Sequence, residues 1–242
     1  MKLLIVRHGD PNYELDTLTK KGWREAELLA ERISQLDVKD FYISPLRRAR
    51  DTASLTLQKM NRTATECQWL REFDGTLIRP DVEREMIPWD WLPQDWMKEE
   101  DFFHYDRWMN PQVVREGKTI PEYEWVISEL DTLLAEHGYA RDGKYYRVEK
   151  ANTDTIVFFC HFGLECVLLS HVLNISPMNL WHHFCAAPTS VTTVVTEERR
   201  KGIASFRVSA FGDISHLYVA GEEPSTSARF CETYDNMEER HD

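Results

Sequence analysis

An arginine and a histidine stand side by side near the start of the chain, in Arg7-His8-Gly9, directly after the apolar run at 3–6. A guanidinium offers a fixed fork of donors to phosphate oxygens, and a neutral imidazole is a nucleophile near pH 7. The tripeptide therefore predicts an anion site with a histidine nucleophile. A polar strand end that turns at 9–11 accounts for the same residues, so the tripeptide does not decide the matter alone.

Two later segments bring similar side chains to the ends of predicted strands. The block at 41–53 predicts a strand followed by a helix, with Ser44 as its N-cap and Pro45 in its first turn. The apolar run at 155–160 ends at His161, and a helical pattern follows at 164–173. Ligands bind at the carboxyl ends of strands in open α/β sheets, so we expect these groups to meet there.

Taken in this order, the segments resemble the histidine phosphatase superfamily, the group that includes cofactor-dependent phosphoglycerate mutases. The matching elements are Arg7-His8-Gly9, Leu18-Thr19 with Gly22, Glu25 and Ala26, the block from Ser44 to Ala53, and His161. The resemblance implies an α/β three-layer sandwich whose central, mostly parallel sheet is flanked by helices. It also implies that His8 is the phosphorylated nucleophile and that Arg7, Arg48 and His161 hold the phosphoryl oxygens.

The arginine assignment follows from the resemblance, because Arg48 is the arginine that precedes Ala49 and Thr52 in the family's pattern. We interpret Arg47 and Arg50 as solvated helix residues. Two guanidiniums and a second imidazole can stabilise a transferring phosphoryl group without a metal ion.

The leaving group also needs a proton, which family members usually take from a carboxyl group after the third strand. Here Glu72 is the predicted acid, and Asp74 is its rival because the following glycine comes one residue early. Asn12 is predicted to bind phosphate, although a turn at 10–12 explains it equally well. Phe162 separates His161 from its glycine, which leaves the shape of the pocket floor open.

The chain predicts one histidine phosphatase domain at 1–220 and a polar tail at 221–242. An insertion at about 76–118 is rich in tryptophan and proline. We expect either an aromatic lid that helps to select the substrate or a satellite core packed on the body, and the two are compatible. Helices are predicted at 19–36 and 119–137, and two strands at 190–196 and 203–210.

Composition restricts the possible partners. The chain has 242 residues, with 29 Lys and Arg against 41 Asp and Glu, for a net charge of −12. This balance disfavours nucleic acid and anionic membranes as partners. Five cysteines without paired spacing favour a reduced, cytoplasmic setting. The group of His182, His183 and Cys185 with 160, 161 and 166 matches no standard zinc spacing, so we predict no metal site.

These observations predict a metal-independent phosphatase that hydrolyses a small phosphorylated substrate through a phosphohistidine on His8, with no cofactor. A phosphomutase of the same superfamily is the first alternative, because Arg71, Arg79 or Arg84 could serve a second phosphate. A non-catalytic phosphate-binding module is the second. The pattern indicates neither the physiological substrate nor an oligomeric state.

Overall fold

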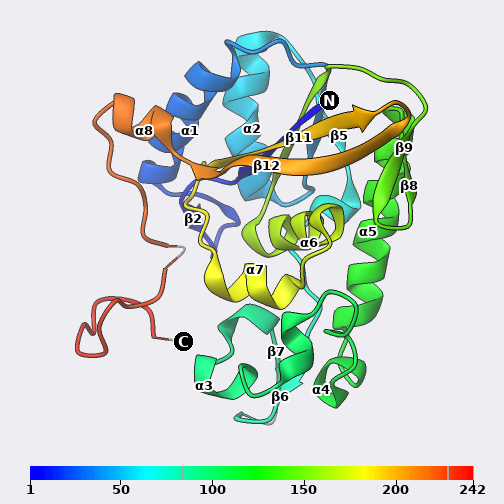
Figure 1. The fold of residues 1–242 in the computed structure, drawn as a ribbon. Coiled ribbons are helices and arrows are strands. Elements are labelled where there is room, and N and C mark those ends of the chain that lie inside the picture. The colour runs from blue at the N-terminus through cyan, green and yellow to red at the C-terminus, as the bar shows by residue number, and fades with distance from the viewer. Residues whose placement is uncertain (83, 228, 242) are drawn as a thin grey trace.

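A mixed sheet runs through the centre of the molecule (Figure 1). In the computed structural model, which describes residues 1–82, 84–227 and 229–241, eight strands pair in the order β5-β4-β10-β1-β11-β12-β9-β8. Their bounds are β1 Lys2–Arg7, β4 Asp40–Ile43, β5 Thr65–Glu66, β8 Tyr139–Asp142, β9 Tyr145–Val148, β10 Thr155–Cys160, β11 Val191–Arg200 and β12 Ile203–Asp213. Neighbours from β5 to β1 are parallel, and those from β1 to β8 are antiparallel.

Helices cover both faces of the sheet, which confirms the predicted layered α/β architecture (Figure 1). One face carries α1 (Lys20–Ile33), α2 (Arg47–Met60) and α8 (Ser215–Val219); the other carries α5 (Thr119–Glu136), α6 (Phe162–Leu173) and α7 (Pro177–His183). Leu4 and Val6 of β1 belong to the core beneath α1 and α2, whereas Leu3 and Ile5 belong to the core of the opposite face. Because this strand is buried on both faces, its sequence is continuously apolar.

Parallel pairing brings three strand ends to one edge of the sheet. In the register, Arg7 of β1 lies opposite Cys160 of β10, and Phe159 lies opposite Ile43 of β4. Beyond these ends, the His8 N–H donates to the Cys160 carbonyl at 3.0 Å and the Ser44 N–H donates to the Phe159 carbonyl at 3.0 Å. The backbone at 8, 44 and 161 is thereby held together.

The tryptophan-rich insertion is a set of short elements below α7 (Figure 1). They are β6 Leu77–Arg79, β7 Arg84–Met86, the 3-10 turns Pro88–Asp90 and Glu100–Phe103, α3 Pro93–Trp96 and α4 Gln112–Arg115. Trp91, Trp96 and Trp108 are buried in the same apolar core as α5 and α6. For these three rings, packing on the body is the main role, while Trp89 is only half-buried.

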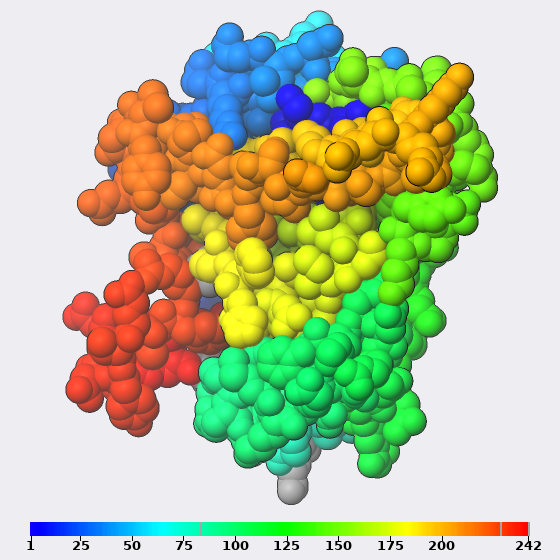
Figure 2. All heavy atoms as spheres, viewed as in Figure 1, coloured from blue at the N-terminus to red at the C-terminus, as the bar shows by residue number. Residues whose placement is uncertain are grey.

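The C-terminal tail follows α8 and ends near α3 (Figure 1). Ser225 anchors it to the body, because its backbone N–H donates to Glu25 Oε1 at 3.1 Å and its hydroxyl contacts the Asp10 carboxylate. Arg240 forms an ion pair with Asp90 of the insertion at 2.6 Å. The space-filling view shows the tail as a lobe beside the body and the insertion (Figure 2).

The helices predicted at 19–36 and 119–137 correspond to α1 and α5, and their ends differ from the predicted ones. Thr19 caps α1, as the Gly22 N–H donates to its Oγ1 at 3.1 Å. Helix α5 also begins at Thr119, but Lys118 is the cap residue and the Thr119 hydroxyl donates to the Thr76 carbonyl at 2.8 Å. A separate two-stranded sheet pairs β2 (Pro11–Asn12) with β3 (Thr17–Leu18). None of the helices in the described ranges is long and apolar enough to cross a membrane.

Candidate active site

His8 lies at the end of β1 and is almost fully buried, with 2 % of its surface exposed. Its Nδ1 lies 2.8 Å from the Gly9 carbonyl, which can only accept, so Nδ1 carries the proton and Nε2 keeps its lone pair. Burial, and secondarily the neighbouring Arg7, hold the pKa of His8 well below its ordinary value. The imidazole is therefore a neutral nucleophile at physiological pH.

His161 faces His8, and their ring centroids lie 5.1 Å apart. Its Nε2 lies 2.7 Å from the Ser44 hydroxyl, which also accepts the Leu46 N–H at 3.2 Å. The prediction that Ser44 is the N-cap of α2 is therefore wrong, because Leu46 holds that position. Burial, followed by the positive charge around it, keeps the pKa of His161 far below its usual range. Both histidines are neutral in this site.

Arg7 and Arg48 approach the two imidazoles from different elements. Arg7 is nearly buried, and its Nη1 donates to the Ala186 carbonyl at 2.6 Å. Arg48 lies in the first turn of α2 and pairs with Asp16 at 2.6 Å. Arg47 and Arg50 are exposed, as predicted. Of the three arginines in this run, the structure thus brings Arg48 to the site.

Three buried nitrogen atoms around His8 have no hydrogen-bond partner within the described part of the chain. They are Nε of Arg7, Nε of Arg48 and Nδ1 of His161. Buried donors without an acceptor are rare, because each costs on the order of 1–3 kcal/mol. A tetrahedral oxyanion supplies acceptors in several directions at once, which is what these groups require.

Glu72 stands beside this cluster, after the 3-10 turn Gln68–Leu70. Its Oε1 accepts the backbone N–H of Phe73 at 2.9 Å and of Leu164 at 3.0 Å. Burial raises the pKa of Glu72 despite these bonds and the nearby arginines. Because both bonds fall on Oε1, a proton on this carboxyl group belongs on Oε2.

The glycine after Phe162 makes this arrangement possible. A Cβ at Gly163 would lie 2.8 Å from Glu72 Oε1 and 2.4 Å from the Trp89 ring. No side chain fits at this position. A glycine there leaves room for the Glu72 carboxyl group and the Trp89 ring. Asp74, the rival acid, has a 70 % exposed side chain and pairs with Arg71 at 2.8 Å.

Asn12 is placed differently from the other predicted residues. Its Oδ1 accepts the Leu15 N–H at 3.2 Å within the turn between β2 and β3. The adjoining cavity has Arg7, Arg48 and Glu72 among its lining residues, whereas Asn12, His8 and His161 are not among them. This side chain supports a turn at 13–16 and not the predicted turn at 10–12, where residues 11–12 form β2. Its contact with phosphate stays a prediction.

The cavity is large, with a volume of about 1300 Å³. Its inner end is the arginine pair with Glu72, and its outer walls come from the insertion, the end of α7 and the C-terminal tail. In the described ranges, no group of three histidine, cysteine or carboxylate side chains could hold a metal ion, so His182, His183 and Cys185 do not join 160, 161 and 166 in such a site.

Comparison with known proteins agrees with this geometry. The model of the histidine phosphatase superfamily (branch 1) matches residues 3–110, the stretch that carries Arg7, His8, Arg48 and Glu72. Over this stretch the chain is similar to the histidine phosphatase superfamily.

The proteins that this chain resembles include a mutase and several phosphatases. The chain is 35 % identical over 79 residues to a 2,3-bisphosphoglycerate-dependent phosphoglycerate mutase of Thermoplasma acidophilum, across 28 % of this chain and 40 % of that protein. The match thus spans less than half of the mutase's length.

Solved structures of other proteins share the fold over most of the chain. A mycobacterial hydrolase is 18 % identical with a TM-score of 0.60, covering 88 % of this chain and 98 % of the other. The Entamoeba histolytica phosphoserine phosphatase, solved with 3-phosphoglyceric acid, is 19 % identical with a TM-score of 0.58, covering 89 % and 98 %.

The sequence analysis did not find the roles of two residues that shape this site. Asp16 pairs with Arg48 and also accepts the Arg47 N–H at 2.8 Å, so it supports the start of α2. Thr52 accepts the Gly9 N–H at 2.9 Å and fixes the backbone next to His8. A buried arginine requires a carboxylate, but no local pattern pointed to one 32 residues away.

Proposed function

We propose that the protein hydrolyses a phosphate monoester through a phosphohistidine intermediate on His8, without a metal ion. The observation that carries the proposal is the set of three unpartnered buried nitrogens, on Arg7, Arg48 and His161, around a neutral imidazole. Such donors match the three equatorial oxygens of a transferring phosphoryl group.

In the first step, Nε2 of His8 attacks phosphorus and the bond to the leaving oxygen breaks. Glu72 gives its Oε2 proton to that oxygen, and the alcohol departs. In the second step, a water molecule attacks the phosphohistidine, and its proton returns to the Glu72 carboxylate. The N–P bond breaks, inorganic phosphate leaves, and His8 is neutral again.

His161 is assigned a positioning and donating role. If the Ser44 hydroxyl donates to Nε2, the single proton of the neutral ring stands on Nδ1, the nitrogen without a partner. That N–H can bind a phosphoryl oxygen without adding a charge. Ser44 can donate in this way because it already accepts from the Leu46 N–H.

A phosphomutase is the second candidate, and the name of the Thermoplasma relative favours it. Hydrolysis is preferred, because two arginines considered for a second phosphate are paired and, unlike Arg48, are not among the described residues with an unpartnered buried nitrogen. Arg71 bonds to Asp74 and to Glu122, both at 2.8 Å, and Arg79 pairs with Asp81.

The five cysteines are free, in support of a reducing, cytoplasmic setting.

The test is phosphate release from a generic aryl phosphate, with and without a chelator, for wild type and His8→Ala. The proposal expects chelator-resistant turnover that the variant loses while its circular dichroism stays unchanged. Loss of activity with chelator would contradict metal independence. Turnover only after a bisphosphate is added would identify the mutase, and phosphate binding without any turnover would identify a binding module.

A further inference from the structure

Five exposed apolar side chains line the candidate active-site cavity. Tyr13, Leu92, Met97, Phe184 and Phe230 are each more than a third exposed, and all five line it. They come from the loop after β1, the insertion, the end of α7 and the tail, which converge beside the body (Figures 1 and 2). Apolar groups concentrated in one cavity mark a ligand-binding wall.

Two half-buried rings lie directly beside the reacting groups. The Arg7 guanidinium carbon lies 5.9 Å from the centre of the Phe162 ring. Trp89 and the Glu72 carboxylate crowd the same glycine, Gly163. Phe162 and Trp89 both line the cavity, next to Arg7 and Glu72.

The cationic groups farther out are already matched by carboxylates. Arg71 pairs with Asp74, Arg240 with Asp90, and Arg229 with Glu232. Burial lowers the pKa of His182 to about 3, so this ring on the wall is neutral. The described lining contains no lysine. Beyond the proposed phosphate-binding groups Arg7, Arg48 and His161, the cavity walls thus favour an uncharged group over a second phosphate or a carboxylate.

We propose that the substrate is a phosphate monoester whose leaving group is bulky and apolar, with an aromatic ring that packs between Phe162 and Trp89. This inference rests on the proposed function. The cavity of about 1300 Å³ has room for such a group, since a cavity of about 150 Å³ accommodates benzene. A small charged ester such as phosphoserine would leave most of these apolar walls uncovered.

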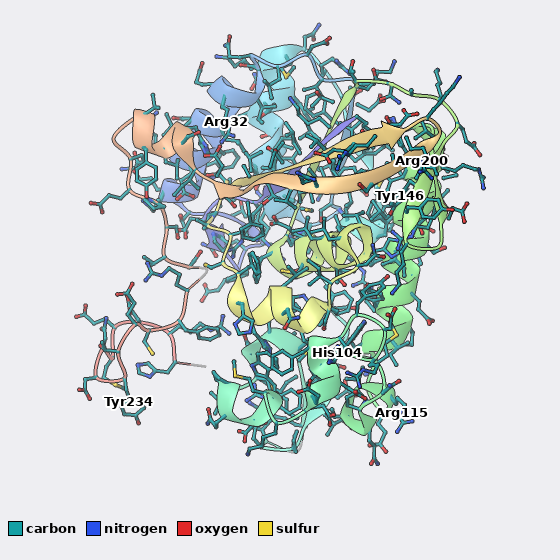
Figure 3. The ribbon with its side chains drawn as sticks, viewed as in Figure 1. Arg32, His104, Arg115, Tyr146, Arg200 and Tyr234 are labelled. Atoms are coloured by element: carbon teal, nitrogen blue, oxygen red, sulfur yellow. The ribbon has the colours of Figure 1, made fainter. Side chains whose placement is uncertain are left out.

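The test compares esters whose leaving alcohols differ in size and charge but are all alkyl alcohols. We expect kcat/KM for benzyl and 2-naphthylmethyl phosphate to exceed that for ethyl phosphate and phosphoserine by at least about tenfold, mainly through KM. Phe162→Leu and Phe184→Ser should narrow this ratio severalfold. Tyr234→Ser is the matched control, because Tyr234 is 84 % exposed on the outer bend of the tail, away from the cavity (Figure 3).

A binding measurement separates this inference from the proposed function. Benzylphosphonate should bind at least about tenfold more tightly than methylphosphonate by calorimetry, with or without turnover. Equal affinities, or a preference for phosphoserine in His8-dependent hydrolysis, would overturn the substrate class and leave the phosphatase intact. A strong benzyl preference in binding without hydrolysis of any ester would overturn the phosphatase and leave the ligand class intact.

Discussion

Oε1 of Glu72 accepts the backbone N–H of Leu164 at 3.0 Å, which ties the candidate acid to the first turn of the helix that follows His161. One carboxyl oxygen is thereby occupied, and the other is left to carry a proton. The bond crosses 92 residues and links the region matched by the family model to the second half of the chain. The candidate acid and His161 are thus positioned by the same helix.

Replacing Glu72 with glutamine removes the transferable proton and keeps the amide oxygen for the two backbone N–H groups. We expect kcat for an alkyl phosphate to fall roughly 100-fold to 10,000-fold, the usual contribution of general acid catalysis. The matched control is Asp74→Asn, which should change kcat less than about threefold. Equal losses in the two variants would assign the acid role to Asp74 instead.

The pH dependence of kcat follows from the directions of two pKa shifts. His8 has a lowered pKa, so it stays unprotonated as the pH falls through 6.5, and the acid limb of kcat should lie below that value. Glu72 has a raised pKa and must be protonated, so kcat should fall as the pH rises through it. Glu72→Gln should abolish this alkaline limb. An acid limb centred at pH 6.5 in the wild type would contradict the neutral buried imidazole.

Asp16 positions Arg48 through their 2.6 Å ion pair, in which the Arg48 side chain is 12 % exposed. Asp16→Asn keeps an oxygen for the Arg47 N–H but removes the charge that orients the guanidinium. We expect the inhibition constant for inorganic phosphate to rise about tenfold, equivalent to about 1.4 kcal/mol. The control is Glu66→Gln. Glu66 is the half-exposed partner of Arg50, which lies on the same helix as Arg48, so this change should leave the affinity for phosphate unchanged.

Glu165 makes stability depend on pH. It is 1 % exposed, and burial raises its pKa from 4.5 to about 7. The folded protein therefore holds this proton more tightly than the unfolded chain, and the resulting stabilisation, complete below pH 4.5, is lost as the pH rises through 7. Glu165→Gln does not titrate, so its stability relative to wild type should increase between pH 5 and pH 8, on the order of 3 kcal/mol. Urea unfolding at both pH values measures this change, and an identical difference at both would contradict the assignment.

The sequence predicted the strand ends well because their signals are local. Apolar runs that stop at Arg7 and at His161 identify strands buried on both faces, and parallel pairing then places both residues at one edge. The sheet is mixed rather than mostly parallel, because the long hairpin of β11 and β12 adds antiparallel strands beside β1. That hairpin was predicted, but its docking position depends on the whole sheet.

Partners distant in sequence explain the remaining differences. A serine followed by a proline is typical of a helix start, yet the Ser44 hydroxyl bonds to His161, 117 residues away. The tail also reaches back across 215 residues, where Ser225 contacts Asp10 beside the nucleophile. Local patterns carry no information about such contacts, so the walls of the cavity became visible only in the fold.

The most direct test of the account is to trap the phosphoenzyme. The protein is mixed with an alkyl phosphate, quenched within milliseconds in base, digested and analysed by mass spectrometry. We expect one phosphoryl group on the peptide that contains His8, stable in base and lost in acid, and absent from His8→Ala. A phosphoryl group on any other residue, or turnover that persists in His8→Ala, would contradict it.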